Sequence, residues 1–172
     1  MKGIKGWIRD LAIAALIAVM IMTFIKPTIV KESSMRPTLY ANNYIFLSKQ
    51  AYRFSEPRRG DIVVFHTELT TNDGHEKLLI KRVIGLPGDV VTIAEGNVYI
   101  NDILLDEPYV NGDMTAGYIE HLTVPDGDVF VMGDNRGVSI DSRDNRVGSV
   151  GINMIVGKAV FRLYPFNMIG LL

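Results

Sequence analysis

An apolar run near the start of the chain constrains the fold of this protein more than any other sequence feature. The run covers fifteen residues from Leu11 to Ile25, and Thr23 is its one polar residue. A membrane-crossing helix needs about 20 residues, so the run reaches spanning length only together with its flanks. We therefore predict a short N-terminal segment at 1–9 and a transmembrane anchor at 10–30.

Two other interpretations of this run are weaker. A cleavable secretory signal also places basic residues before an apolar stretch, but residues 24–30 contain no small-x-small cleavage site. A buried helix of a soluble protein would need other helices to pack against, and no other segment keeps a period near 3.6. The sequence therefore favours an uncleaved single-pass anchor. Three basic residues flank the run on each side, so the positive-inside rule does not orient it: Lys2, Lys5 and Arg9 precede it, and Lys26, Lys31 and Arg36 follow it.

Composition excludes several classes of function. The formal net charge is −1, and the 18 lysines and arginines are scattered rather than gathered into a basic stripe, so we expect no nucleic-acid partner. The chain has no cysteine, which excludes disulfides, thiol catalysis and cysteine-based metal sites. No cluster of histidines and carboxylates has metal-ligand spacing, so we expect neither a metal nor a cofactor.

The rest of the chain has the pattern of a β protein. Short β-branched and aromatic runs alternate with Gly-, Pro-, Asn- and Asp-containing turns. We expect a compact, mainly antiparallel β domain at 31–172, with an inserted subdomain at 94–127. The strand candidates are 44–47, 61–65, 78–84, 90–93, 97–100, 128–132 and 155–163.

Ser34 is a candidate nucleophile a few residues beyond the predicted anchor. Pro37 removes a backbone donor and biases the preceding residue toward an extended conformation, which would present Ser34 rather than bury it in a sheet ladder. By itself, a serine in this setting is most often an ordinary loop residue, and a nucleophilic role requires a nearby base. The three histidines lie in no recognisable triad setting: His66, His75 and His121.

Lys81 is the alternative candidate for that base. On a strand it shares one face with Leu79 and Val83, while the opposite face carries Ile80 and Arg82. If the face of Lys81 is buried, desolvation lowers the pKa of its amine and a neutral general base results. Both faces are apolar apart from one cation each, so the pattern alone leaves the burial of Lys81 open.

Four stretches of the β region resemble the boxes of bacterial type I signal peptidases. They are S-M-R-P-T-L at 34–39, R-G-D-I-V-V-F at 59–65, K-R-V-I-G-L-P-G-D at 81–89 and G-D-N-R-G-V-S-I-D-S-R at 133–143. They follow an N-terminal anchor in the order typical of that family. The resemblance implies a β domain of the signal peptidase type, whose catalytic core is shared with LexA-like self-cleaving repressors.

The resemblance also implies roles for individual residues. It makes Ser34 the nucleophile, Lys81 the general base and Ser139 the hydroxyl that holds the lysine amine in place. The backbone N–H of Ser34 corresponds to one donor of the oxyanion hole. The remaining expected site residues shape the site or line the substrate pocket: Asp134, Asp141 and Arg143 shape it through charged hydrogen bonds, and Met35 lines it.

One position departs from the family pattern. Two residues before the nucleophile, some family members have a serine that completes the oxyanion hole and others have glycine, whereas this chain has Glu32. A carboxylate aimed at a developing oxyanion would repel it, so we expect Glu32 to turn away from the site.

Together these features imply a membrane-bound serine endopeptidase that removes signal peptides from exported precursors after Ala-x-Ala-like sites. Its expected partners are those precursors and the lipid bilayer, with no nucleic acid, and we expect a monomer. We place the catalytic domain on the extracytoplasmic side of the plasma membrane because of this function. The alternative is a non-catalytic relative that assembles surface proteins, and the presence of both Ser34 and Lys81 argues against it.

Overall fold

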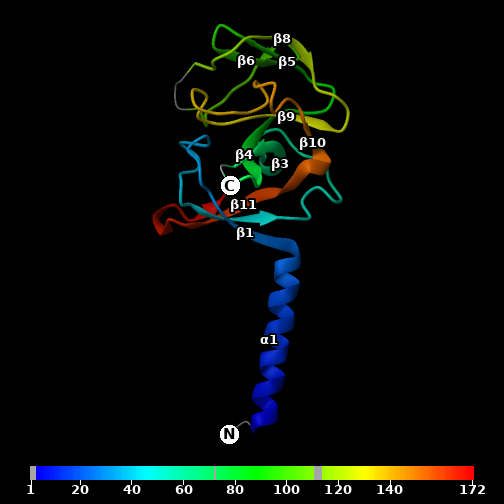
Figure 1. Cartoon of the computed structure of the whole chain (residues 1–172), viewed down its shortest axis with the longest axis vertical. Coiled ribbons are helices and arrows are strands. Elements are labelled where there is room, and N and C mark those ends of the chain that lie inside the picture. Colours follow the sequence, from blue (N-terminus) through cyan, green and yellow to red (C-terminus); the bar gives the residue numbers. More distant parts are fainter. Residues whose placement is uncertain (1–2, 72, 111–113) are drawn as a thin grey trace.

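The structure is a computed structural model that describes residues 3–71, 73–110 and 114–172. A long helix, α1, covers Ile4–Phe24 and stands away from a β domain formed by the rest of the chain (Figure 1). Its segment Gly6–Phe24 has a mean hydropathy of 1.9 and is long and apolar enough to cross a membrane, and none of it is buried within the chain. The helix ends six residues before the predicted anchor does, because Ile25–Ile29 form strand β1. Pro27 lies within this strand and has no N–H for continuing a helix.

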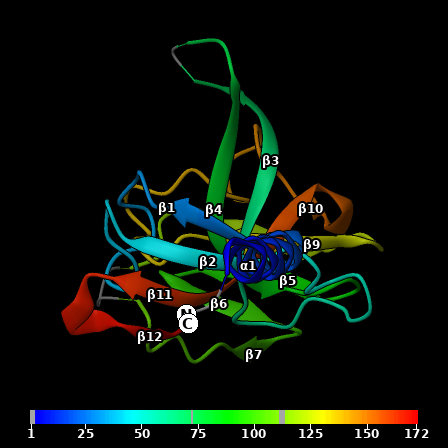
Figure 2. The ribbon, with the colours of Figure 1, turned by 90° about the horizontal axis from the view of Figure 1, so that it is seen from below.

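The main sheet has the strand order β1-β2-β11-β3-β4-β9-β10, with β12 paired to β11, and every strand pair is antiparallel. The hairpin of β3 and β4 projects from the body of the domain (Figure 2). Two short 3₁₀ helices, Ile152–Met154 and Phe166–Met168, flank β11. The strands are β1 Ile25–Ile29, β2 Tyr44–Ser48, β3 Ile62–Thr70, β4 Glu76–Gly85, β9 Asp128–Met132, β10 Val150–Gly151, β11 Ile155–Tyr164 and β12 Gly170–Leu171.

A smaller antiparallel sheet, the accessory sheet, lies at the end of the domain far from α1 (Figure 1). Its order is β7-β6-β5-β8. It occupies most of the segment predicted as an insertion at 94–127, but it begins earlier, because β5 pairs with both β6 and β8 rather than with the main sheet. The strands are β5 Val90–Ala94, β6 Asn97–Ile100, β7 Ile103–Leu104 and β8 Ile119–Thr123.

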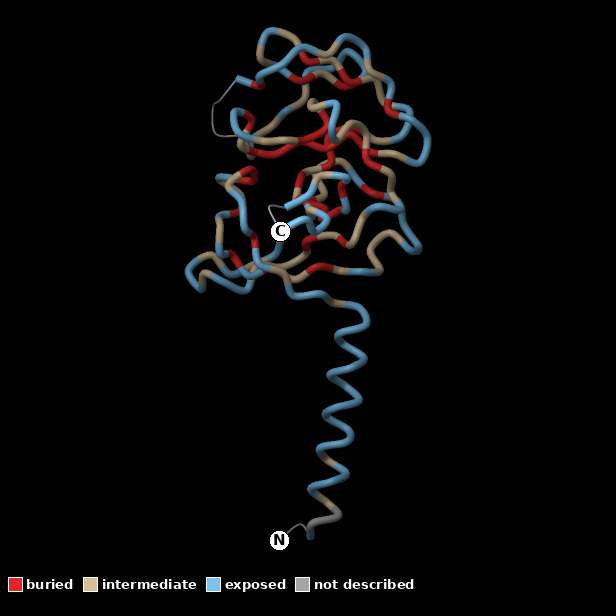
Figure 3. Tube along the Cα trace, viewed as in Figure 1, coloured by how far each residue is buried: buried red, intermediate tan, exposed pale blue. Residues whose placement is uncertain are grey.

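The core consists of three clusters of buried apolar side chains between and beneath the strands (Figure 3). One cluster joins the turn after β1 to β2 and β11, one lies under the accessory sheet, and one lies between β3, β4 and β9. The prediction of a mainly antiparallel β domain behind an N-terminal apolar helix is confirmed, and each of the seven strand candidates overlaps an observed strand.

Candidate active site

Ser34 lies in the turn that follows β1, and two buried apolar side chains that follow it in the chain hold this turn. Met35 and Leu39 are fully buried in the core cluster next to β2, and the Leu39 N–H donates to the Met35 carbonyl at 2.8 Å. Burial of an apolar side chain such as methionine or leucine stabilises a fold by about 1.5–3 kcal/mol. The turn is therefore anchored directly beside Ser34, whose exposed fraction is 5%.

Lys81 lies on β4 and points into the same region from the opposite side. Its face of the strand, shared with Leu79 and Val83, is the buried one, so the tertiary structure decides the question that the sequence pattern left open. Only 1% of Lys81 is exposed. Its Nζ lies 2.8 Å from Ser34 Oγ and donates to the Ile80 carbonyl at 2.9 Å.

The electrostatic environment of Lys81 favours its neutral form. Burial is the largest influence and lowers the pKa of the amine from 10.5 to about 8, although the carboxylates of Asp141 and Glu32 act in the opposite direction. A neutral amine has a lone pair that can accept a proton from a hydroxyl. The pair thus has the distance that a nucleophile and its base require, and burial increases the fraction of the amine that is neutral.

The loop after β9 forms the back of the site. The Asn135 N–H donates to the Ser34 carbonyl at 2.9 Å, and the Asn135 side chain donates to the Ser33 carbonyl at 3.3 Å. Gly133 approaches so closely that a Cβ there would lie 2.5 Å from the Ser34 carbonyl oxygen, so the loop requires glycine at this point. The loop therefore fixes the backbone that carries the hydroxyl.

Two ion pairs formed by predicted site residues help to hold this loop in place. Asp134, which is 1% exposed, accepts from Arg82 at 2.9 and 2.7 Å and from the Thr38 hydroxyl. Asp141 is fully buried and accepts from Arg143 at 2.8 and 2.9 Å.

Asp141 also accepts the Gly133 N–H at 2.9 Å. Burial alone would raise the pKa of Asp141, but the bonds from Arg143 and Gly133 outweigh it and hold that pKa below its usual value. The predicted site-shaping residues Asp134, Asp141 and Arg143 thus lie around the loop and do not contact the Ser34 hydroxyl through any bond found among the described residues.

Two predicted contacts differ from the structure. Ser139 was expected to hold the Lys81 amine, but no hydrogen bond joins these two residues within the described part of the chain. The Ser139 hydroxyl lies against Gly133 instead and, beside Asp141, helps to lower the pKa of that carboxyl. The amine is satisfied instead by Ile80 and Ser34. Met35 was expected to contact substrate, but its side chain is 0% exposed and packs in the core, because the turn needs an apolar anchor there.

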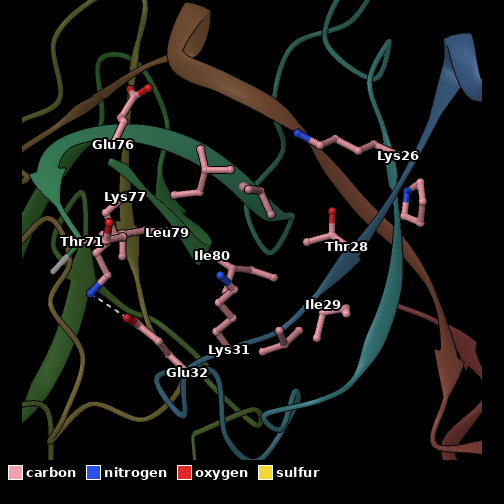
Figure 4. A pocket seen from close by; sticks show the side chains of 14 residues that line it. Lys26, Thr28, Ile29, Lys31, Glu32, Thr71, Glu76, Lys77, Leu79 and Ile80 are labelled. Atoms are coloured by element: carbon pink, nitrogen blue, oxygen red, sulfur yellow. Dashed lines mark ion pairs between the residues drawn. The ribbon is translucent and has the colours of Figure 1, made fainter. Parts of the chain in front are cut away.

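The Glu32 carboxylate, which lies two residues before the nucleophile, forms an ion pair with a lysine of β4. Its Oε1 lies 2.6 Å from Nζ of Lys77 on β4 (Figure 4). Lys77 lies four residues before Lys81 on this strand and therefore on the same face. Sequence reasoning missed Lys77, although its four-residue separation from Lys81 on one strand is the signal that could have indicated a shared face.

A groove of about 570 Å³ lies between β1 and β4, and its lining includes Glu32 and Ile80, which are close in sequence to the two members of the dyad (Figure 4). Among the described residues, β1 pairs only with β2, and the part of β4 before Arg82 pairs only with β3. Each strand therefore leaves one backbone edge facing the groove, and Ile29, Leu79 and Ile80 contribute apolar side chains to its walls. Two free edges on either side of a groove are suited to receive an extended peptide.

The remaining titratable side chains in the part of the chain that the structure describes lie away from the Ser34–Lys81 pair or form no metal-ligand group. It contains no group of three or more histidine, aspartate and glutamate side chains that could hold a metal. His66 and His121 pair with carboxylates on the surface, Glu76 and Asp102 respectively, rather than with Ser34.

Comparisons with known proteins identify relatives over nearly the whole chain. Residues 4–164 match the family model described as signal peptidase, peptidase S26. The chain is 38% identical to a probable signal peptidase I-2 of Synechocystis sp. over 95% of its own length and 75% of that protein. It is 39% identical to signal peptidase I S of Bacillus subtilis over 96% of its own length and 92% of that protein. A crystal structure of a signal peptidase I from Enterococcus faecalis is 31% identical, covers 60% of this chain and 97% of that one, and has a TM-score of 0.49.

Proposed function

Because this chain belongs to the signal peptidase family, peptidase S26, and is a serine endopeptidase of the signal peptidase I type, we propose that it cleaves exported precursors with Ser34 as nucleophile and Lys81 as general base. The observation that carries the proposal is the 2.8 Å contact between Lys81 Nζ and Ser34 Oγ, made by an amine that is 1% exposed. An ordinary surface lysine would be charged and could not accept the proton.

The reaction proceeds through an acyl-enzyme. Neutral Lys81 accepts the hydroxyl proton as Ser34 Oγ attacks the scissile carbonyl, and the resulting ammonium donates that proton to the leaving amine. Water then hydrolyses the ester with the same base. The Ser34 backbone N–H stabilises the oxyanion, and the ion pair with Lys77 keeps the Glu32 carboxylate from facing the developing negative charge.

The groove accounts for the substrate class. An extended precursor segment pairs its backbone with the free edges of β1 and β4, which supplies affinity without demanding a particular sequence. Small residues at the first and third positions before the scissile bond fill shallow apolar pockets, which gives an Ala-x-Ala-like preference.

Helix α1 tethers the enzyme to the membrane that also holds the signal helix of the substrate. Confinement to one surface raises the effective concentration of each partner for the other. β1 follows α1 without a linker, so the groove begins where the helix ends. We place the catalytic domain on the extracytoplasmic face of the plasma membrane, where translocated precursors appear.

The test is cleavage of a purified precursor by the full chain in detergent, compared with Ser34→Ala and Lys81→Ala variants. We expect each single variant to lose activity by at least about 1,000-fold, because the two groups act as a unit. Lys49→Ala, in the turn after β2, is the matched lysine control and should cleave at the wild-type rate. Near wild-type activity of either dyad variant would refute the assignment.

A further inference from the structure

The segment between β7 and β8 contacts both the accessory sheet and the loop after β9 that forms the back of the site. We call residues 105–110 and 114–116 of this segment the connecting arm. Its residues are bonded to the accessory sheet, since the Leu105 N–H donates to the Val98 carbonyl at 2.9 Å and the Thr115 N–H to the Gly96 carbonyl at 3.0 Å. The arm is therefore fixed at both ends to a sheet that makes no contact with Ser34 or Lys81 through any hydrogen bond found in the described ranges.

Glu107 of the arm forms a further buried ion pair with the loop, and its partner is Arg136. Arg136 has a side chain that is 0% exposed, and its two terminal nitrogens lie 2.8 and 2.5 Å from the Glu107 carboxylate oxygens. The same guanidinium donates to the Thr115 hydroxyl at 2.6 Å. A buried guanidinium requires such a set of acceptors, because a buried charge left unpaired is strongly destabilising.

Arg136 transmits this constraint to the nucleophile. Its Nε donates to the Gly133 carbonyl at 3.1 Å, while the Gly133 N–H is held by Asp141. The loop fixed in this way contacts Ser34 from Gly133 and donates from the Asn135 N–H to the Ser34 carbonyl. A continuous series of contacts therefore runs from Glu107 to the backbone of the nucleophile.

The arm contacts the other two arginines around the site as well. The ring of Tyr109 lies under the Arg82 guanidinium at 4.1 Å, and its hydroxyl donates to Glu107 at 2.9 Å. The Ala116 carbonyl accepts from Arg143 at 3.0 Å. Each arginine that orders the loop thus has at least one partner on the arm and another on the loop or on an adjacent strand.

We propose that Glu107 is a positioning residue, through which the accessory sheet fixes the Gly133–Asn135 loop and so the Ser34 nucleophile. The inference rests on the proposed function, because it assigns Glu107 a role in placing the same Ser34. Glu107 acts through Arg136 and has no contact with the reacting atoms. Through Glu107 the accessory sheet influences the rate of the reaction.

The test compares Glu107→Gln, Glu107→Asp and Glu120→Gln in the full chain, with kcat and KM measured on an Ala-x-Ala precursor peptide. Glu120 lies exposed on β8 and is the matched control for loss of a carboxylate from the accessory sheet. We expect Glu107→Gln to lower kcat about 100-fold with KM within about twofold, because a small misplacement of a nucleophile can cost that much. Glu107→Asp should restore part of kcat, and Glu120→Gln should match wild type.

Amide hydrogen exchange separates positioning from general destabilisation. If Glu107 positions the loop, the Asn135 amide should lose protection in Glu107→Gln while the amides of β3 and β4 keep theirs. Equal loss of protection in β3, β4 and the loop, or a kcat equal to that of Glu120→Gln, would overturn the proposal.

If Glu107→Gln does not fold, the Thr115→Val variant tests the positioning role in its place. It removes one hydrogen bond to Arg136 at nearly constant volume and should lower kcat about fivefold with the same exchange signature, since one such bond contributes about that factor. A wild-type kcat for Thr115→Val would then overturn the proposal. Ser34→Ala distinguishes the two hypotheses: if it is inactive while Glu107→Gln behaves as wild type, only the positioning role fails.

Discussion

Raising the pH from 6 to 10 tests the ionisation of Lys81 directly, because only the neutral amine can act as the base. With a pKa of about 8, roughly 9% of the amine is neutral at pH 7, whereas a lysine with the ordinary value of 10.5 would be about 0.03% neutral. Burial of the side chain thus increases the fraction of active base about 300-fold at pH 7. We expect kcat/KM to rise about tenfold per pH unit below pH 7, reach half its maximum near pH 8 and level off above pH 9.

The assay is cleavage of a fluorogenic Ala-x-Ala peptide that carries no group titrating in this range. Two variants of the ion pair between Glu32 and Lys77 provide a further test of the Lys81 pKa. The Glu32 carboxylate raises the pKa of Lys81 and the Lys77 ammonium lowers it. Glu32→Gln should therefore move the midpoint of the pH profile down, and Lys77→Gln should move it up.

A pH profile of kcat/KM whose midpoint differs clearly from pH 8 would contradict the assignment of a buried lysine as the base. A midpoint near 6.5 would indicate a histidine base, and a rate still rising at pH 10 would indicate a solvated lysine. Shifts of the same sign in Glu32→Gln and Lys77→Gln would show that the two charges do not act on Lys81 as the structure indicates.

Three further predictions concern stability and packing at the site. Below pH 8 the unfolded chain binds a proton at residue 81 that folding must remove or bury, so burial of Lys81 lowers the stability of the folded state by about 3 kcal/mol, and this loss disappears between about pH 8 and 10.5. Lys81→Met should be inactive yet melt about 6–12 °C higher than wild type at pH 7, and this gain should vanish by pH 10.5 in thermal melts. Gly133→Ala should lower kcat about 100-fold, because its Cβ would collide with the Ser34 carbonyl; an unchanged kcat in the peptide assay would contradict the close approach. Met35→Ala should lower the free energy of unfolding by about 2–5 kcal/mol in urea titrations, since it empties a fully buried position; a change below about 1 kcal/mol would show that the side chain is not a core anchor.

The kinds of secondary structure along the chain, and the candidate dyad, could be predicted from the residues alone. Fifteen apolar residues can be satisfied only in lipid or in a core of other helices, and the chain offers no such helices, so the helix at Ile4–Phe24 was predictable apart from its ends. Alternating β-branched runs predicted the strands because the period of two is a local property of each segment. The four boxes and their order led to the prediction that Ser34 is the nucleophile and Lys81 the base, since both residues stand in motifs of the family.

The contacts between residues that are distant in sequence became visible in the folded chain and could not be predicted beforehand. Both faces of β4 are apolar in sequence, so the burial of Lys81 follows from the placement of β3 and β9 beside that strand and of the Ser34 turn over it. The core position of Met35, the separation of Ser139 from Lys81 and the pairing of Glu32 with Lys77 likewise depend on contacts between segments distant along the chain. Local pattern carries no information on such contacts, because the energy of a buried side chain is set by the neighbours that enclose it.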